Sequence, residues 1–110
     1  MRVWISLAMC TVACGVSTDR DRYPEQIAKA QCQFDKACYR AEFFYDHINV
    51  PDCFDESMSI WADVAPEYDD CSFNEDKAVE CLEWYSRSCK ITGKELDQLI
   101  NDCESVWRCG

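Results

Sequence analysis

Apolar side chains recur at helical spacing in several parts of the chain, and the longest such stretch is 24–45. Its apolar positions follow one another at steps of three and four residues, which is the period of an amphipathic helix with one buried face. Proline is favoured at the first helical position, so a helix is expected from Pro24 to about Asp46. A break is expected at 47–51, because the residue before Pro51 avoids helical geometry.

Two shorter helices are predicted after this break. The second helix is expected to run from its N-cap, Asp52, to about Val64, with one apolar face. A polar loop that contains a proline follows at 65–72. The third helix is expected to follow Asn74 as its N-cap, because acidic residues occupy its first turn and apolar residues continue beyond it at helical spacing.

The fourth helix has the clearest start signal. Thr92 stands three residues before Glu95, as in a capping box, and apolar residues continue at helical spacing to Trp107. Strand signals are poor throughout, since no stretch alternates apolar and polar residues. The pattern therefore predicts an all-α fold, a small bundle of about four helices.

The cysteines change this picture, because the chain has 10 of them in 110 residues. Two, Cys10 and Cys14, lie in the apolar N-terminal segment. An even set of eight behind an export signal predicts four disulfides. Zinc or iron–sulfur ligation is the alternative, but it usually shows close C-x-x-C pairs, which are absent here. The eight are Cys32, Cys38, Cys53, Cys71, Cys81, Cys89, Cys103 and Cys109.

Helix geometry narrows the pairing only in part. Eight cysteines allow roughly a hundred connectivities. Cys32 and Cys38 lie six residues apart on one helix and cannot pair with each other, so each is expected to tie the first helix to a different partner. If the first two helices form an antiparallel hairpin, Cys38 and Cys53 lie on either side of the turn. The one pairing we predict is therefore Cys38 with Cys53, which requires the first helix to end early or the loop to fold back.

The N-terminus has the features of an export signal. A positive start precedes an apolar run at 3–13 that is too short to span a membrane. The segment 11–15 resembles a bacterial lipobox, in which the small residue Ala13 precedes Cys14, the cysteine that would receive a lipid. We expect a signal peptide at 1–13, a lipid-anchored flexible tether at 14–22 and a disulfide-rich domain at 23–110. The alternative is ordinary secretion with cleavage after Gly15 or Ser17.

Charge and motifs exclude several function classes. The net charge of -10 argues against nucleic acid and against docking on anionic lipid. The only histidine, His47, is expected to be an exposed loop residue, and no phosphate loop or catalytic motif is present. Two groups of acidic residues could in principle bind calcium, but helix capping and solvated surface charge explain them better. They are Asp52/Asp55/Glu56 and Glu67/Asp69/Asp70. We therefore expect no enzyme activity, cofactor or metal.

Large aromatic residues give a candidate contact site. Phe43, Phe44 and Tyr45 are adjacent, as are Trp84 and Tyr85. Consecutive helix positions cannot all face one core, so some aromatic surface is expected to be exposed. The candidate contact patch for a protein partner consists of Phe43, Phe44, Tyr45 and Trp84. The alternative is a small core that wraps around the helices.

The lipobox-like start, the helical pattern and the cysteine spacing together resemble small cysteine-rich lipoproteins that are abundant in myxobacteria and related bacteria. The resemblance rests on 11–15, the cysteines of the first helix, the run 74–82, the Ser88-Cys89 pair and the closing Cys103-x5-Cys109. It implies a helical fold and a lipid-anchored position at the outer membrane or cell surface, and it implies no catalytic residue.

The sequence thus predicts an exported, acidic cell-envelope protein with a binding or structural role, held to the membrane by its N-terminal lipid. An unknown protein is its expected partner, and nucleic acid is not. The alternatives are a freely secreted, disulfide-rich effector and a carrier with an internal cavity for a small ligand or lipid. A secreted enzyme or toxin fits less well, because no set of acid, base and nucleophile is visible.

Overall fold

A computed structural model describes residues 16–87 and 89–110 of the chain. These residues are mainly helical, which confirms the predicted all-α fold. The expected signal peptide and Cys14 lie outside the described residues. The elements in chain order are α2 (Tyr23–Cys38), α3 (Arg40–Asp46), α4 (Val50–Val64), the 3-10 helix η1 (Ala65–Tyr68), β1 (Ser72–Phe73), α5 (Glu75–Trp84), α6 (Gly93–Glu104) and β2 (Trp107–Arg108).

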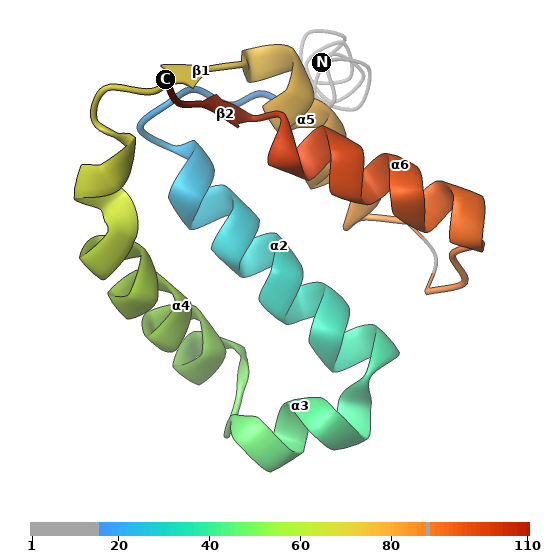
Figure 1. Cartoon of the computed structure of the whole chain (residues 1–110). Helices are drawn as coiled ribbons and strands as arrows, with labels where there is room; N and C mark the ends of the chain where they lie inside the picture. The colour runs from blue at the N-terminus through green and yellow to red at the C-terminus, as the bar shows by residue number, and fades with distance from the viewer. Residues whose placement is uncertain (1–15, 88) are drawn as a thin grey trace, which may run out of the picture.

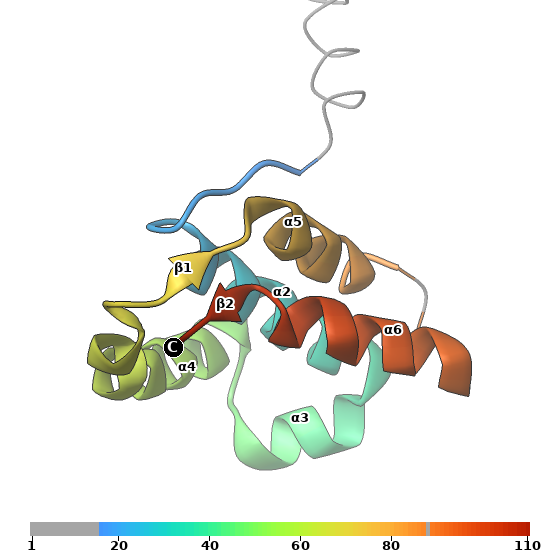
Figure 2. The same cartoon turned by 45° about the horizontal axis from the view of Figure 1, so that its top comes forward.

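Helix α2 occupies the centre of the molecule, and the other helices pack around it. Helix α4 runs along one side of α2, while α5 and α6 form a pair on the other side (Figure 1). The short helix α3 crosses one end of α2. The strands β1 and β2 pair at the opposite end, where the described N-terminal segment also lies (Figure 2).

The single first helix predicted from Pro24 to Asp46 is in fact two helices. Tyr39 leaves the helical conformation, with φ -132° and ψ 54°, and separates α2 from α3. The break turns the chain so that Phe43 is buried on Cys32 and Cys53. A continuous helix would have carried Phe43 onward, away from this cluster.

Helix α4 begins earlier than its sequence indicated. Its N-cap is Asn49, whose side-chain oxygen accepts a hydrogen bond from the backbone N–H of Asp52 at 2.9 Å, and Pro51 lies in the first turn. The prediction of Asp52 as N-cap is therefore wrong. The Asp52 carboxylate instead accepts a hydrogen bond from the backbone N–H of Ile48 at 3.0 Å and so closes the same turn from outside.

The two remaining helix starts are confirmed. Asn74 caps α5 by accepting from the backbone N–H of Lys77 at 3.0 Å. Thr92 and Glu95 form the predicted capping box, in which the Glu95 N–H donates to the Thr92 hydroxyl at 3.2 Å. Helix α6 ends at Glu104 and does not continue to Trp107, because the chain extends there into β2.

Four disulfides connect these elements, as predicted from the eight cysteines. They join Cys32 to Cys53, Cys38 to Cys89, Cys71 to Cys109 and Cys81 to Cys103. The predicted Cys38–Cys53 pair is wrong. Helix α3 carries the chain past the end of α2 and back, so that the first turn of α4 lies beside Cys32, with a Cα–Cα distance of 6.0 Å. Cys32 and Cys38 do tie α2 to two different partners, as expected.

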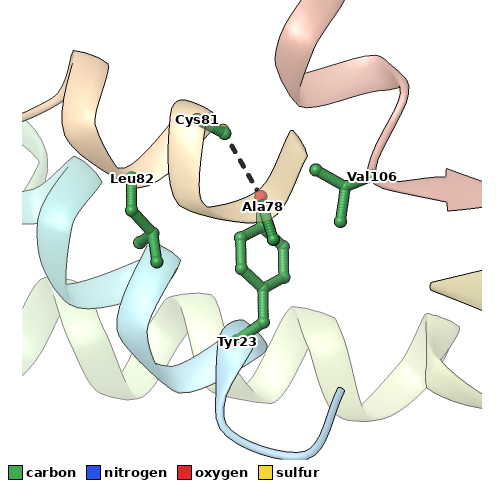
Figure 3. Packing of buried hydrophobic residues seen from close by; sticks show 5 residues of the cluster. All are labelled: Tyr23, Ala78, Cys81, Leu82 and Val106. Atoms are coloured by element: carbon green, nitrogen blue, oxygen red, sulfur yellow. Dashed lines mark hydrogen bonds between the residues drawn. The ribbon is translucent and has the colours of Figure 1, made fainter. Parts of the chain in front are cut away.

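The larger core cluster lies between α2, α5 and the end of α6. It consists of Tyr23, Ala78, Cys81, Leu82 and Val106 (Figure 3). Ala78, Cys81 and Val106 are completely inaccessible to solvent. The Tyr23 hydroxyl donates a hydrogen bond to the Cys81 sulfur at 3.3 Å, and burial raises the pKa of this phenol, with a smaller contribution from Tyr85.

A buried carboxylate joins α5 to α6. Asp102 accepts hydrogen bonds from the Trp84 indole N–H at 2.9 Å, the Gln98 amide at 2.9 Å and the Lys77 ammonium at 3.1 Å. Burial acts to raise the pKa of Asp102, but these donors outweigh it and the pKa lies below its usual value. These hydrogen bonds therefore stabilise the charged form of Asp102.

Part of the predicted tether belongs to the domain. Thr18 is buried and its hydroxyl bonds to the Gln26 side chain. The Arg20 guanidinium donates to the carbonyl oxygens of Cys71 at 2.6 Å and Tyr68 at 2.7 Å, and it lies 4.9 Å from the centre of the Trp107 ring. The chain is therefore fixed to the domain from Thr18, five residues before the boundary expected at 23.

Candidate functional site

An open apolar groove runs along α2, between α4 and the end of α6, and its volume is about 420 Å³. Its floor is formed by α2 at Pro24, Ile27 and Gln31. Figure 1 shows α2 lying between α4 and α6, which form the two sides. The side chains of the two walls are Ser57, Ile60, Trp61 and Val64 from α4, with Tyr68 after it, and Cys103 and Trp107 from α6 and β2.

The α4 wall follows from helical spacing. Ser57, Ile60, Trp61 and Val64 recur at steps of three and four and so share one face of α4. The sequence predicted an apolar face made of Phe54, Met58 and Trp61, with Ile60 and Val64 flanking it, but Cys53 is the only residue of α4 that is buried. The Cys32–Cys53 disulfide holds the first turn of α4 against α2, and the rest of the face remains open to the groove.

A cluster of rings closes one end of the groove. We call Trp61, Tyr68 and Trp107 the aromatic cluster. Their ring centres lie 5.4 Å, 5.8 Å and 5.4 Å apart, and Trp61 stacks on both of the others. Phe73 extends the cluster, with its ring 5.0 Å from Trp107. The cluster therefore joins α4, η1 and β2 into one rigid end wall.

Exposed aliphatic side chains lie in the groove and next to it: Ile60 lines it, whereas Leu96 and Ile100 lie on α6 outside its lining. Ile60 on α4 is 58% exposed. On α6, Leu96 and Ile100 are each 46% exposed, and they stand seven and three residues before Cys103. Residues at these spacings share one helical face, so Leu96 and Ile100 continue the face of α6 that carries the groove residue Cys103. Apolar surface of this kind is stabilised when a partner covers it.

The predicted contact patch is divided by the structure. Phe43 and Trp84 are buried, Phe43 on the Cys32–Cys53 disulfide and Trp84 through its indole bond to Asp102, so neither can contact a partner. Phe44 and Tyr45 on α3 are exposed, and Tyr45 is 90% exposed. The Arg40 guanidinium covers one side of the Phe44 ring, 5.0 Å from its centre. The patch as predicted is therefore wrong, and only its α3 half reaches solvent.

His47 lies in a more enclosed setting than the exposed loop that was expected. Its side chain is 18% exposed, and its Nδ1 lies 3.5 Å from the Glu56 carboxylate and 3.8 Å from that of Asp52. This nitrogen has no hydrogen-bond partner among the described residues. Burial raises the pKa of nearby Asp35, and His47 opposes that shift. The arrangement closes the corner between α3 and α4.

The described residues contain neither a free cysteine thiol nor a cluster of metal ligands beside the groove. The eight cysteines of the domain are all in disulfides, so none of them offers a thiol. Within 16–87 and 89–110, no three histidine, cysteine or acidic side chains converge as metal ligands. In the same ranges no helix is long and apolar enough to cross a membrane.

The sequence missed the groove because apolar helix faces look the same whether a neighbour covers them or not. Trp61 was expected on the apolar face of the second helix, with Ile60 and Val64 flanking it, and Leu96 and Ile100 were expected in the apolar stripe of the fourth helix. The signal that could have found them is the excess of apolar faces over what a single small core can bury.

Fold and site together define a disulfide-stapled helical domain with an open apolar groove, a class of framework typical of oxidising compartments. In comparisons with known proteins, no family model, no curated protein and no solved structure matches this chain.

Proposed function

We propose that this is an exported binding protein of the bacterial cell envelope, anchored by a lipid on Cys14, and that its groove along α2 receives an apolar segment of another protein. Four disulfides support a position outside the cytoplasm. The lipobox-like segment and the resemblance to small cysteine-rich lipoproteins support the anchor. The domain acts by binding, and no catalytic step is assigned to it.

The observation that carries the proposal is the groove itself. Its volume of about 420 Å³ falls in the range of roughly 300–1,000 Å³ that is typical of ligand sites. The groove is open to solvent, and Ile60, which lines it, is exposed, as is Ile100, three residues before the lining residue Cys103 on α6. Covering each half-exposed isoleucine would contribute on the order of 1 kcal/mol to binding. An open groove with apolar rims suits a helical or extended segment better than it suits a small molecule that needs enclosure.

Groove binding is tested with an amphipathic helical peptide that carries leucines on one face and uncharged glutamines on the other. Its affinity is measured by fluorescence anisotropy for the disulfide-intact chain. Ile60→Asp and Ile100→Asp are each expected to weaken binding about tenfold, since a charge on the rim opposes apolar contact.

Ile48→Asp is the matched control, because Ile48 is exposed and precedes α4, nine residues before Ser57, the first residue of α4 that lines the groove. It is expected to leave the affinity within about twofold, as for a surface change away from the contact. Absence of saturable binding, or an equal loss in all three variants, would contradict the groove as the site.

The anchor is tested separately by the intact mass of protein from the membrane fraction of a bacterial host. The proposal expects the mass of residues 14–110 plus acyl chains, with eight alkylations that appear only after reduction. A lipid-free mass that starts at Val16 or Thr18 would overturn the anchor and leave a secreted binding protein.

A further inference from the structure

We propose that the segment received by the groove is a basic amphipathic helix, whose lysine or arginine side chains meet acidic residues on both rims. This inference rests on the proposed function of the groove and adds the chemical character of its partner. It is carried by the distribution of charge around the exposed isoleucines, which the apolar groove alone does not explain.

The α4 rim combines an exposed isoleucine with a row of carboxylates. Glu56 and Asp63 stand four residues before and three residues after Ile60, and Glu67 follows seven residues after it. All four side chains are exposed. At these spacings they lie along one ridge of the helix. The whole of 50–68 contains no lysine or arginine, so no basic residue of this segment neutralises the ridge.

The α6 rim repeats the same arrangement. Asp97 and Glu104 stand three residues before and four residues after Ile100, and both are exposed. The one basic residue of α6 is Lys94, nine residues before Cys103. Nine residues correspond to about two and a half turns, so Lys94 lies on the face of α6 opposite to Cys103, and three residues separate it from Asp97, its neighbour on the helix surface.

The basic residue nearest the aromatic end is already engaged. The Arg20 guanidinium bonds to the backbone carbonyls of Tyr68 and Cys71 and stacks on Trp107. Along α2, Lys29 is two residues beyond Ile27 on the floor, which places it on the far side of the helix. The groove is therefore apolar along its centre and acidic on both margins.

A helix that fits this groove carries an apolar stripe with basic residues on both sides of it. The face of α6 from Leu96 to Cys103 spans roughly 10 Å, so it would contact about two turns of such a helix. Opposite charges on the rims steer the partner toward the groove and set its orientation, while a helix with acidic flanks meets like charges on both sides.

The test uses three peptides with the same leucine stripe and with lysine, glutamine or glutamate on the flanks. Binding to the full disulfide-intact chain is measured by fluorescence anisotropy at two salt concentrations. The lysine peptide is expected to bind at least about tenfold more tightly than the glutamate peptide at 50 mM salt, and the preference is expected to shrink at 0.5 M salt through screening.

Two charge variants distinguish the rims from the net charge of the protein. The rim variant is D63N/E67Q/D97N/E104Q, and the control variant is E25Q/E42Q/D55N/E83Q, which removes four carboxylates away from the rims. Glu56 is kept, since its carboxylate lies 3.5 Å from His47. The rim variant is expected to lose most of the lysine preference, whereas the control is expected to keep it within about threefold.

The outcomes separate this inference from the function on which it rests. Equal affinity for the three peptides, or an equal loss of preference in the rim and control variants, would overturn the basic partner and leave the groove as a site for apolar segments. Absence of binding by all three peptides would overturn the groove itself, and the inference with it.

Discussion

The two sides of α2 are packed differently. On the side of α5 and α6, Ala78, Cys81 and Val106 are fully buried, and Asp102 joins the two helices through hydrogen bonds from Lys77 and Trp84. On the side of α4, Cys53 is the one buried residue of a fifteen-residue helix. The first side is a packed core. The second is a helix held at its ends, by a disulfide and by the aromatic cluster, with an apolar face left open between them.

The difference shows how a small domain can retain an uncovered apolar face. A helix that keeps Ile60 and Trp61 available for a partner gives up part of the burial that would otherwise hold it in place. The Cys32–Cys53 disulfide supplies constraint without covering the groove. Changes on the two sides of α2 are therefore expected to have different consequences for stability and for binding.

The largest effect is expected from Asp102→Ala on the packed side. The change leaves the Trp84 indole N–H without its acceptor and removes the buried partner of Lys77. Breaking a buried, hydrogen-bonded carboxylate costs about 4 kcal/mol of unfolding free energy. Urea denaturation measures the loss, and Asp97→Ala, on the exposed face of the same helix, serves as control with a change under about 0.5 kcal/mol. An equal loss of unfolding free energy in Asp102→Ala and Asp97→Ala would contradict the role assigned to Asp102.

The second-largest loss of stability is expected when the Cys32–Cys53 disulfide, which ties α4 to α2, is removed in the variant C32A/C53A. The disulfide closes a separation of 21 residues, for which the loss of constraint corresponds to about 3 kcal/mol. Hydrogen exchange should show faster exchange of the α4 amides, while the α5 and α6 amides stay protected up to global unfolding. Uniform acceleration across all helices would instead mean that α4 belongs to the same cooperative unit as the core.

A smaller effect is expected from pH, again on the packed side. The folded pKa of Asp102 lies below its unfolded value, which is about 3.9. Its contribution to stability is therefore complete above that unfolded value and is lost as the pH falls through the folded pKa. Urea midpoints measured down to pH 2 should fall less steeply in Asp102→Asn than in the native chain. Identical slopes would show that Asp102 does not supply this dependence.

The smallest effect is expected at the N-terminal segment. Arg20→Gln removes the guanidinium that bonds to the Tyr68 and Cys71 carbonyls, at a cost of about 1 kcal/mol. Arg22→Gln is the control, since Arg22 makes an exposed ion pair with Asp19 that contributes little. Thermal unfolding compares the two variants. A greater loss in Arg22→Gln would contradict the assignment of Arg20 as the residue that fixes this segment.

Local signals explain which parts of the fold could be predicted. The caps of α5 and α6 depend on residues three positions apart, Asn74 with Lys77 and Thr92 with Glu95, so the sequence contains the whole interaction. The strands β1 and β2 are two residues long each and depend on contacts between segments that are distant in sequence. They are therefore too short to show an alternation of apolar and polar residues. The same limit applies to the break at Tyr39, which follows from where Phe43 becomes buried.

The candidate site was harder to predict for a related reason. The patch at Phe43, Phe44, Tyr45 and Trp84 was chosen because adjacent aromatic residues cannot all face one core. Helical spacing shows that some of these four side chains must be exposed, but it does not show which ones. Phe43 and Trp84 proved to be buried, while Ile60 and Ile100, which fit ordinary helical stripes, proved to be exposed. Only the arrangement of α4 and α6 around α2 shows which of these apolar side chains are buried and which are exposed.

The most direct test of the account is to map the contact surface by amide chemical shifts as the lysine-flanked peptide is added. We predict that the shifts concentrate on the floor and walls of the groove, around Ile27, Ile60, Trp61, Ile100 and Trp107. Shifts concentrated on α3, around Phe44 and Tyr45, would contradict the groove and return the contact to the exposed half of the aromatic patch.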